Sequence, residues 1–329
     1  MSPVSDPAPV VVVGAGISGV ACAGELLAAG VPVRLIDRGR RIGGRMGAKR
    51  MADRATDLGA SYFTVSDPDF EAVVADWQQR GLAHPWTDTF TVLTAGEEVS
   101  SKAGPMRWGA RGALRSLVED LAAGLAVEQA AVELVDRDGD GRLVVDGAPA
   151  SAVILAMPDS QAQRLLGPAV RDEVGVLDRP SEPVIALAAW WPERSWDDVS
   201  PEGRFHGAFV NGDDAVGWIA DDGRRLGDDA LVLVAHSTPA LAAEHLEDPA
   251  AAGPPMLAAL GRLMGLGAPV GTHVHRWSLA RPIDERAAPF LLSAGGVGIC
   301  GDAWGPSPKV ETAWRSGRDL GRALAKQLG

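Results

Sequence analysis

The first forty residues combine apolar runs with glycine-rich turns. Residues 10–13 are four consecutive valines, which predict a strand buried on both faces, as in a parallel sheet. A helical pattern begins at Ile17 and ends near Gly30, where a glycine favours a helix stop. Residues 31–37 have a second strand pattern that ends on an acid, Asp37. Together these elements predict a βαβ unit.

Farther along the chain, the same patterns predict a mixture of helices and strands. Helical periodicity occurs in residues 69–80, 112–124, 256–264 and 310–328. Strand patterns occur in residues 90–93, 132–135, 143–145, 152–157, 184–191, 230–236 and 297–302. Residues 138–141 are Asp-Gly-Asp-Gly, which predicts a hairpin turn. The segment 167–271 contains four tryptophans and predicts an inserted antiparallel domain with one or two helices.

Composition and charge narrow the class of protein. The chain has 329 residues, 46% hydrophobic and 22% charged, which is typical of a soluble globular protein. The formal net charge is −12, so a broad basic face for nucleic acid or anionic lipid is not expected. No apolar run reaches the roughly 18 residues of a membrane span. Residues 1–9 lack the features of a secretory signal, and we therefore expect a cytoplasmic protein.

The two cysteines do not indicate a disulfide framework or a metal site. Cys22 lies in a predicted helix and Cys300 in a predicted strand, both in apolar surroundings. This placement favours two buried thiols in a reducing compartment. The chain contains neither C-x-x-C nor H-E-x-x-H, so no metal site is expected.

The turn after the first predicted strand has the spacing of a dinucleotide-binding motif, Gly14-x-Gly16-x-x-Gly19. Gly14 permits a tight turn, Gly16 lets the backbone approach a pyrophosphate, and Gly19 lets the helix pack close to the strand. The helix N-terminus offers N–H groups and a partial positive charge to phosphates. Asp37 can accept hydrogen bonds from the adenosine ribose, and its charge disfavours a 2′-phosphate and hence NADP.

Three further segments indicate which dinucleotide is bound. Gly43-Gly44-Arg45-Met46 and Asp57-Leu58-Gly59-Ala60 follow the first motif, and Gly301-Asp302 precedes the helix predicted from residue 310. This combination resembles the FAD-binding family that includes amine oxidases, phytoene desaturases and renalases. The resemblance implies that Arg45 reaches the pyrophosphate, which suits a charge-assisted contact. It also implies that Asp302 binds ribitol or pyrophosphate hydroxyls and that the last helix points at the flavin.

Several other segments make the chain similar to the bacterial renalase-like proteins. They are residues 44–50, 57–64, 107–108, 275–282, 300–304 and 310–314. The resemblance implies an α/β fold: a Rossmann-like FAD-binding domain of the p-hydroxybenzoate hydroxylase-like, two-dinucleotide-binding-domain type, interleaved with an antiparallel sheet-plus-helix substrate domain. We expect the FAD-binding domain to comprise residues 1–65, 102–166 and 272–329, and the substrate domain residues 66–101 and 167–271.

The motifs and the resemblance together indicate site residues. The expected cofactor-binding residues are Gly14, Gly16, Ile17, Ser18, Gly19, Asp37, Arg38, Gly44, Arg45, Met46, Gly59, Ala60, Ser61, Tyr62, Val132, Ala156, Gly301, Asp302, Val310, Glu311 and Ala313. The expected catalytic residues, which would border the flavin and the substrate, are Tyr62, His236, His275 and Trp304. For the two histidines, packing in the interior or at the surface is the more frequent alternative.

The resemblance implies non-covalently bound FAD and oxidation of a dihydronicotinamide dinucleotide isomer. The substrate would pass a hydride to flavin N5, and O₂ would then accept the electrons and give H₂O₂. Hydride departure from a dihydropyridine needs no protein base, and no catalytic triad or carboxylate pair is evident in the sequence.

Two alternatives remain open. The first is a flavin amine oxidase acting on a small amine; such enzymes typically carry a lysine in the substrate domain, whereas this chain has none between Lys102 and Lys309. The second is an FAD-binding module without turnover.

Overall fold

The computed structural model describes residues 8–51, 53–284 and 286–329. Within them the chain forms two compact units, each assembled from separate stretches of sequence. Unit 1 contains the described residues up to 44 together with residues 118–180 and 282–329, and unit 2 contains residues 45–117 and 181–281. Among the described residues, we find no helix with the length and apolar character needed to cross a membrane.

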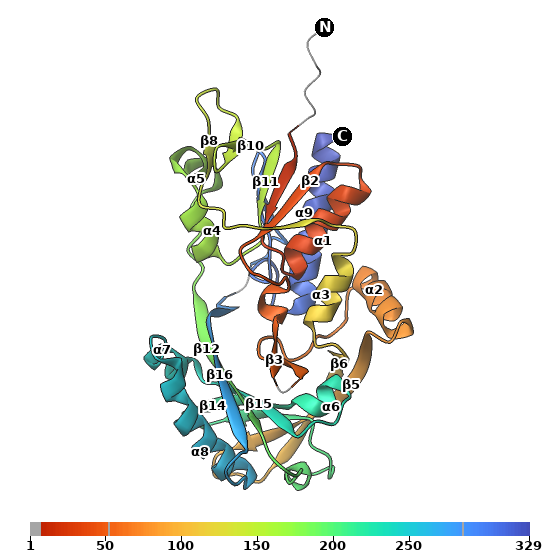
Figure 1. Cartoon of the computed structure of the whole chain (residues 1–329), viewed down its shortest axis with the longest axis vertical. Helices are drawn as coiled ribbons and strands as arrows, with labels where there is room; N and C mark the ends of the chain where they lie inside the picture. Colours follow the sequence, from red (N-terminus) through yellow and green to blue (C-terminus); the bar gives the residue numbers. More distant parts are fainter. Residues whose placement is uncertain (1–7, 52, 285) are drawn as a thin grey trace. The chain divides into compact units, whose positions relative to one another are not determined.

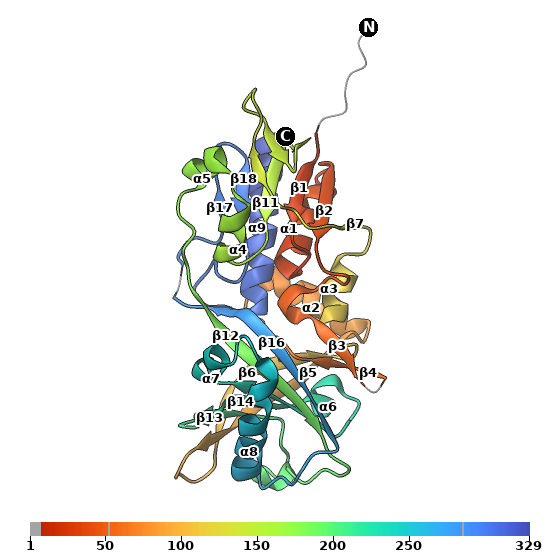
Figure 2. The ribbon, with the colours of Figure 1, turned by 60° about the vertical axis from the view of Figure 1, so that its left-hand side comes forward.

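Unit 1 is built on a six-stranded sheet with the order β17-β18-β11-β1-β2-β7 (Figure 2). The strands are β1 (Val10–Val13), β2 (Val33–Asp37), β7 (Val127–Gln129), β11 (Ala152–Leu155), β17 (Leu291–Leu292) and β18 (Val297–Ile299). All neighbouring pairs are parallel except β17 with β18, which is antiparallel. The predicted βαβ unit is confirmed, because β1 and β2 pair in parallel on either side of α1 (Ile17–Ala28).

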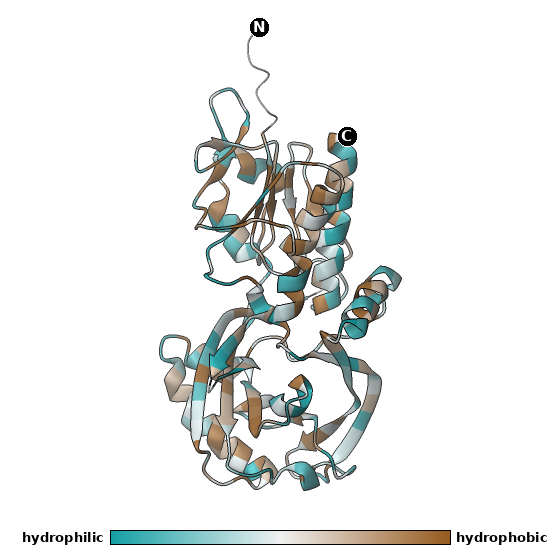
Figure 3. Cartoon of the chain, turned by 45° about the vertical axis from the view of Figure 1, so that its right-hand side comes forward, coloured by the Kyte–Doolittle hydropathy of each residue, from teal (hydrophilic) through white to brown (hydrophobic). Residues whose placement is uncertain are grey.

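Both faces of this sheet are covered, which explains the nearly uninterrupted apolar strands. Val11 and Val13 belong to a buried cluster that also contains apolar residues of α4 (Asp159–Leu165) and α5 (Pro168–Val174). On the opposite face, a Cβ at Gly298 of β18 would meet the Leu320 side chain of α9 (Val310–Leu328) at 3.0 Å. Figure 3 shows the same strands as predominantly hydrophobic.

Helices α1 and α9 lie side by side (Figures 1 and 2). Their close approach depends on glycines of α9. A Cβ at Gly317 would overlap the carbonyl oxygen of Ser18, and one at Gly321 would lie 2.8 Å from the carbonyl oxygen of Cys22. The last helix is thereby held against the helix that follows the glycine-rich turn.

A small antiparallel sheet in unit 1 contains β8 (Val135–Arg137), β9 (Leu143–Val145) and β10 (Ala148–Pro149). The hairpin predicted around residues 138–141 is present. The strand predicted from residue 132 begins only at Val135, so Val132 lies in the connection from β7. Asp146 explains this correction: its Oδ1 accepts hydrogen bonds from the amides of Glu133 and Leu134, at 3.0 and 2.8 Å.

Unit 2 is built on a seven-stranded sheet with the order β16-β12-β15-β14-β13-β5-β6. Its strands are β5 (Ala83–Thr94), β6 (Ser100–Ala110), β12 (Ser181–Trp190), β13 (Gly207–Asn211), β14 (Val216–Asp221), β15 (Val232–Ser237) and β16 (Gly271–Pro282). The pair β13–β5 is parallel, whereas β12–β15, β15–β14, β14–β13 and β5–β6 are antiparallel. Strands β3 (Ala48–Met51) and β4 (Arg54–Asp57) form a separate hairpin.

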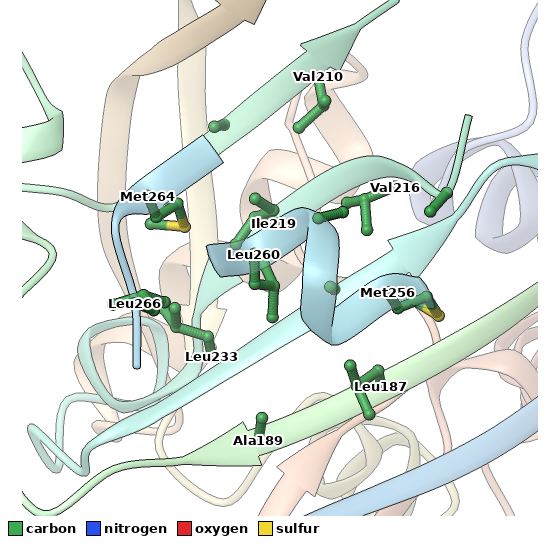
Figure 4. Close-up of a cluster of buried hydrophobic side chains, with 14 of the residues drawn as sticks. Leu187, Ala189, Val210, Val216, Ile219, Leu233, Met256, Leu260, Met264 and Leu266 are labelled. Atoms are coloured by element: carbon green, nitrogen blue, oxygen red, sulfur yellow. The ribbon is translucent and has the colours of Figure 1, made fainter. Parts of the chain in front are cut away.

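The other helices of unit 2 are α2 (Pro68–Gln79), α6 (Asp222–Leu226), α7 (Pro239–Glu244) and α8 (Gly253–Met264), whereas α3 (Arg115–Leu121) has residues in both units. Helix α8 supplies much of the apolar core of unit 2. Figure 4 shows Met256, Leu260 and Met264 on α8 turned toward the sheet residues Leu187 and Ile219. All five side chains are at most 5% exposed, so this burial stabilises the unit by the usual hydrophobic contribution of about 25 cal/mol per Å².

The boundaries of the compact units differ from those predicted for the domains. Residues 45–65 and 102–117, expected in the FAD-binding domain, belong to unit 2, and residues 167–180, expected in the substrate domain, belong to unit 1. The first difference arises because β6 pairs with β5, and because Arg54 and Leu58 form hydrogen bonds with Asp222, His236 and Trp277 of unit 2. The second arises because α5 packs its apolar side on the core of unit 1. The assignment of each unit to FAD or substrate stays a prediction.

Candidate functional site

In unit 1, the predicted cofactor residues gather at the carboxyl edge of the parallel sheet. Gly14 follows β1, Asp37 ends β2, Ala156 follows β11, and Gly301 comes two residues after β18. Parallel strands end on the same side, so four segments distant in sequence meet along one edge. Open α/β sheets bind their ligands in the crevice at this edge.

The glycine-rich turn has no room for larger side chains at two of its positions. Gly14 has φ +107°, and a Cβ there would lie 2.6 Å from the Ala156 carbonyl oxygen. A Cβ at Gly19 would overlap the Gly14 carbonyl oxygen. These positions therefore need glycine for the turn and for helix–strand contact, as the motif predicts.

The space beside the α1 N-terminus is free of side chains because Gly16 and Gly44 face each other there. A Cβ at Gly16 would have Gly44 Cα, at 3.9 Å, as its nearest neighbour, so the two loops approach each other without a side chain between them. Helix α1 begins at Ile17 with no side-chain cap and no acidic residue in its first turn. Its first N–H groups are thus suited to an anion such as a pyrophosphate. The Ser18 side chain is buried and interacts with the Cys300 thiol.

Asp37 ties this turn to β2. Its Oδ2 accepts a hydrogen bond from the Ala15 amide at 2.6 Å, and its Oδ1 accepts one from the Gly39 amide at 2.7 Å. A carboxylate oxygen can accept a second hydrogen bond, so both oxygens can still bind ribose hydroxyls. The neighbouring Arg38 is exposed.

The second predicted FAD segment is held by α9. The Gly301 amide donates to Ser316 Oγ at 3.1 Å, and Gly301 has φ +149°. Asp302 follows and is half-buried. Helix α9 starts at Val310 after Lys309, which provides no side-chain cap, and its first turn contains the buried Glu311 and Ala313.

In unit 2, the segment Asp57–Tyr62 is held by side chains from distant strands and helices. The Leu58 carbonyl accepts hydrogen bonds from His236 Nε2 at 3.2 Å and from Trp277 Nε1 at 2.8 Å. Arg225 donates to the carbonyls of Ser61 and Asp57 at 2.9 and 3.2 Å. Trp218 Nε1 donates to Ser61 Oγ at 3.0 Å. Five hydrogen bonds from four distant side chains therefore hold this segment in place.

The same segment contacts the loop that contains Arg45. The Ala60 amide donates to the Arg45 carbonyl at 2.9 Å, and a Cβ at Gly59 would overlap that carbonyl oxygen. Gly59 is thus required for close backbone packing. The half-buried Arg45 side chain reaches the Ala280 carbonyl at 3.3 Å, whereas Met46 is buried.

A buried charge cluster lies beneath this segment. Arg225, at 0% exposure, forms an ion pair with Asp222 and lies 3.9 Å from an Asp57 oxygen. Arg54 also pairs with Asp222, at 2.5 Å. Burial raises the pKa of Asp57 to about 7. Sequence reasoning missed Arg225 and Asp222, because they belong to a charged run, residues 221–225, of the kind that usually faces solvent.

Three of the predicted catalytic residues lie around the Asp57–Tyr62 segment in unit 2. Tyr62 packs in a cluster with Trp86, Phe90 and Trp218, with ring centroids 5.3–6.3 Å from its own. His275 contacts Trp277 edge-on at 4.6 Å. The fourth predicted residue, Trp304, is a buried residue of unit 1, just after β18.

The histidines near this segment are neutral. Burial lowers the pKa of His236 to about 4 and also lowers the pKa of His275. A carbonyl oxygen can only accept, so the His236 bond to Leu58 assigns the proton to Nε2 and leaves Nδ1 as an acceptor. His236 is thus suited to hydrogen bonding and unsuited to acid catalysis at neutral pH.

We expect His236→Asn to slow flavin reduction without changing its pH dependence. The substitution alters the hydrogen bond that positions the Leu58 loop. A displacement of about 1 Å costs about 100-fold in rate, so we expect the rate of flavin reduction to fall by no more than this factor. The imidazole, with a pKa of about 4, stays neutral from pH 6 to 9, so no titration is lost. Stopped-flow reduction across this pH range measures both effects. Loss, in the variant, of a titration step that the wild-type enzyme shows in this range would show that His236 acts as an acid or base.

Family models match nearly the whole chain. The NAD(P)-binding Rossmann-like domain matches residues 12–77, and the flavin containing amine oxidoreductase family matches residues 88–323, more than half of the chain. The chain belongs to the flavin containing amine oxidoreductase family. Its cofactor is accordingly FAD, and the predicted mixed α/β fold with a Rossmann-like FAD-binding domain is confirmed.

Solved structures of this fold include amine oxidases. A putrescine oxidase bound to putrescine is 18% identical, with a TM-score of 0.71 over 98% of this chain and 99% of that one. Cyclohexylamine oxidase from Brevibacterium oxydans IH-35A is 15% identical, with a TM-score of 0.72 and the same coverage. A putative protoporphyrinogen oxidase from Exiguobacterium sp. 255-15 is 14% identical, with a TM-score of 0.74, again over 98% and 99%. These identities establish the shared fold.

The residues of unit 1 fit FAD. A Cβ at Gly16 would meet no atom closer than 3.9 Å, and the α1 N-terminus beside it is uncapped. In addition, Trp304 Nε1 is buried without a hydrogen-bond acceptor among the described residues. A buried donor without a partner costs about 1–3 kcal/mol, which a bound ligand with an acceptor atom can offset.

Proposed function

We propose that this flavoenzyme is renalase-like and oxidises a dihydronicotinamide dinucleotide isomer. The observation that carries the proposal is the neutrality of the predicted substrate-facing side chains. The pKa of Tyr62 is raised, chiefly by burial, and the pKa values of His236 and His275 are lowered by burial, so all three are uncharged at neutral pH. Such side chains suit an uncharged dihydropyridine ring and offer no carboxylate to an ammonium group.

Bound FAD supplies the redox chemistry, taking two electrons with a hydride from the donor and passing electrons to O₂ to give H₂O₂. The protein's own task is to bind and orient the donor. Tyr62 and the aromatic rings around it offer contact area for a flat ring. His236 Nδ1 can accept a hydrogen bond from an amide or hydroxyl of the donor. No protein group has to remove a proton from carbon in this reaction.

We further propose how FAD is held. In unit 1, the glycine turn and the α1 N-terminus would bind the pyrophosphate, Asp37 the ribose, and Asp302 the ribitol or pyrophosphate hydroxyls. The attachment would be non-covalent: both thiols are buried, and burial raises their pKa values, that of Cys300 to about 12. Thiols in this state are unreactive toward a flavin. Denatured protein should therefore release FAD into solution.

Oxidation of a small amine is the second candidate. It is supported by the family and by the fold shared with putrescine oxidase and cyclohexylamine oxidase. A neutral lining also admits the unprotonated form of an amine, which is the form able to release a hydride. The lack of any lysine between Lys102 and Lys309 sets this chain apart from the usual amine oxidase pattern described above.

Anaerobic flavin reduction distinguishes the two candidates. We expect dihydronicotinamide isomers to bleach the flavin absorption near about 450 nm within seconds, and primary amines to do so at least about 100-fold more slowly. Readmission of O₂ should restore the band and produce H₂O₂. Rapid bleaching by putrescine or cyclohexylamine, with none by any dihydronicotinamide, would assign the protein to amine oxidation. A flavin that no donor reduces would identify a binding module.

A further inference from the structure

The indole of Trp304 is held by an arginine that the motifs do not include. Trp304 lies five residues beyond the end of β18 and is 7% exposed. The Arg286 guanidinium carbon lies 4.0 Å from the centroid of the indole ring, in cation–π geometry. The Arg286 amide also donates to the carbonyl of Gly305 at 3.3 Å. The backbone and the side chain of Arg286 therefore both contact the Trp304 loop.

Arg286 is itself fixed by a buried carboxylate. Its Nη1 donates to Asp159 Oδ1 at 3.0 Å and its Nη2 donates to Asp159 Oδ2, which makes a two-pronged ion pair. The Asp159 side chain is 1% exposed and that of Arg286 is 15% exposed. The Arg179 amide also donates to Asp159 Oδ2, at 3.2 Å. A planar guanidinium with two such bonds has little freedom to rotate, so it restricts the movement of the indole ring that it contacts.

Stability alone does not explain the contact between Asp159, Arg286 and Trp304. A buried ion pair often contributes less to stability than apolar residues of similar volume, because both ions lose their hydration. The Trp304 Nε1–H adds a second cost, since it is buried and finds no acceptor within residues 8–51, 53–284 and 286–329. The protein thus fixes an indole rigidly while leaving its only polar atom without a partner.

The position of the indole suggests which partner is missing. Trp304 follows Asp302 on the loop after β18, at the carboxyl edge where the glycine turn, Asp37 and Ala156 are also found. That edge contains the residues of unit 1 that fit FAD, and the flavin has carbonyl and ring-nitrogen acceptors. An indole N–H only donates hydrogen bonds, so it can donate one to such a flavin atom.

We propose that Arg286 is a positioning residue: with Asp159 it fixes the Trp304 indole so that Nε1–H donates a hydrogen bond to bound FAD. The inference rests on FAD as the cofactor and not on the identity of the hydride donor, so it stands whether the donor is a dihydronicotinamide or an amine. A hydrogen bond to the flavin alters the electron density of its ring. It therefore affects the visible spectrum and the midpoint potential of the holoenzyme before any substrate is added.

The test compares three variants of the holoenzyme. Trp304→Phe removes the N–H and keeps an aromatic ring, and Arg286→Lys keeps the charge but loses the two-pronged, stacked geometry. Arg137→Lys is the matched control: Arg137 pairs with Glu173 at 2.7 Å in the same unit, and the side chains are 23% and 22% exposed. Within the part of the chain that the structure describes, no aromatic ring lies under the Arg137 guanidinium. The readouts are the flavin spectrum, its midpoint potential, the Kd for FAD and the Tm.

We expect Trp304→Phe to shift the flavin spectrum and the potential, and to weaken FAD binding about tenfold, the effect of losing one hydrogen bond. Arg286→Lys should shift the flavin spectrum and the midpoint potential in the same direction by a smaller amount. Arg137→Lys should leave the flavin spectrum and the midpoint potential unchanged, even if it lowers the Tm as much as Arg286→Lys does. If Arg286→Lys loses Tm but keeps the wild-type spectrum, potential and Kd, Arg286 is merely structural. If Trp304→Phe changes only the KM for the hydride donor, the indole serves the substrate and the proposal is wrong.

Discussion

Replacing Arg225 by methionine is expected to lower the free energy of unfolding by about 3–5 kcal/mol, the cost of breaking a buried ion pair by removing one partner. Arg225 is fully buried, and Asp222 and Asp57 are also buried beside it. The variant leaves the Asp57 charge without its nearest cation and leaves the Ser61 carbonyl without its donor. Urea unfolding of the holoprotein, followed by circular dichroism, measures the loss.

The control for Arg225→Met is Arg142→Met. Arg142 pairs with Asp140 at 3.5 Å, but both side chains are 72% exposed, so this change should cost no more than about 1 kcal/mol. A cost below about 1 kcal/mol for Arg225→Met would mean that the cluster is solvated and that our account of the Asp57–Tyr62 loop is wrong.

The loss in free energy of unfolding caused by Arg225→Met should also depend on pH. Burial raises the pKa of Asp57 to about 7 in the folded protein, above its ordinary value of 3.8. The folded state therefore holds this proton more tightly than the unfolded state, and the resulting stability is lost as pH rises from about 4 to about 7. Removing Arg225 raises the pKa of Asp57 further. The difference between wild type and variant should thus shrink as pH falls from about 8 to about 5.

The second large effect is expected for Gly19→Ala, which should reduce the FAD content of purified protein by at least about tenfold. The added Cβ would overlap the Gly14 carbonyl oxygen and lie 3.0 Å from Ala156 Cβ. Neither backbone nor Cβ can move aside without shifting α1 from β1, and this shift would open the turn that we propose binds the pyrophosphate. The flavin-to-protein absorbance ratio and the Kd for FAD measure the loss.

Gly24→Ala provides a control on the same helix. Gly24 lies in α1, and a Cβ there would meet no atom within 4 Å. Alanine in a helix interior is favoured over glycine by about 1 kcal/mol, so this variant should bind FAD normally and be slightly more stable. If Gly19→Ala retained FAD as well as Gly24→Ala does, the turn would not be the cofactor cradle.

Features that depend on short stretches of chain could be predicted from the sequence. The run of four valines before Gly14 predicted β1, and the glycine spacing predicted a turn whose close contacts the structure shows. The apolar periodicity of residues 310–328 predicted α9. These predictions succeed because a buried strand, a positive φ and an amphipathic helix each restrict the residues at neighbouring positions. Motifs of the same local kind indicated the family and FAD, although the substrate stays a proposal.

Other features were decided by the tertiary structure. Residues 45–65 belong to unit 2 because Arg54 and Leu58 form hydrogen bonds with distant residues of that unit, although their motif indicates the cofactor. Arg225 is buried against Ser61, 164 residues away, and Arg286 reaches Asp159 across 127 residues. A charged side chain in a sequence ordinarily indicates a solvated surface, and its burial depends on a partner that no local pattern reveals. The glycine turn could be predicted from the sequence because its requirements are local, whereas the residues that hold Leu58 and Trp304 in place were decided by contacts between distant parts of the chain.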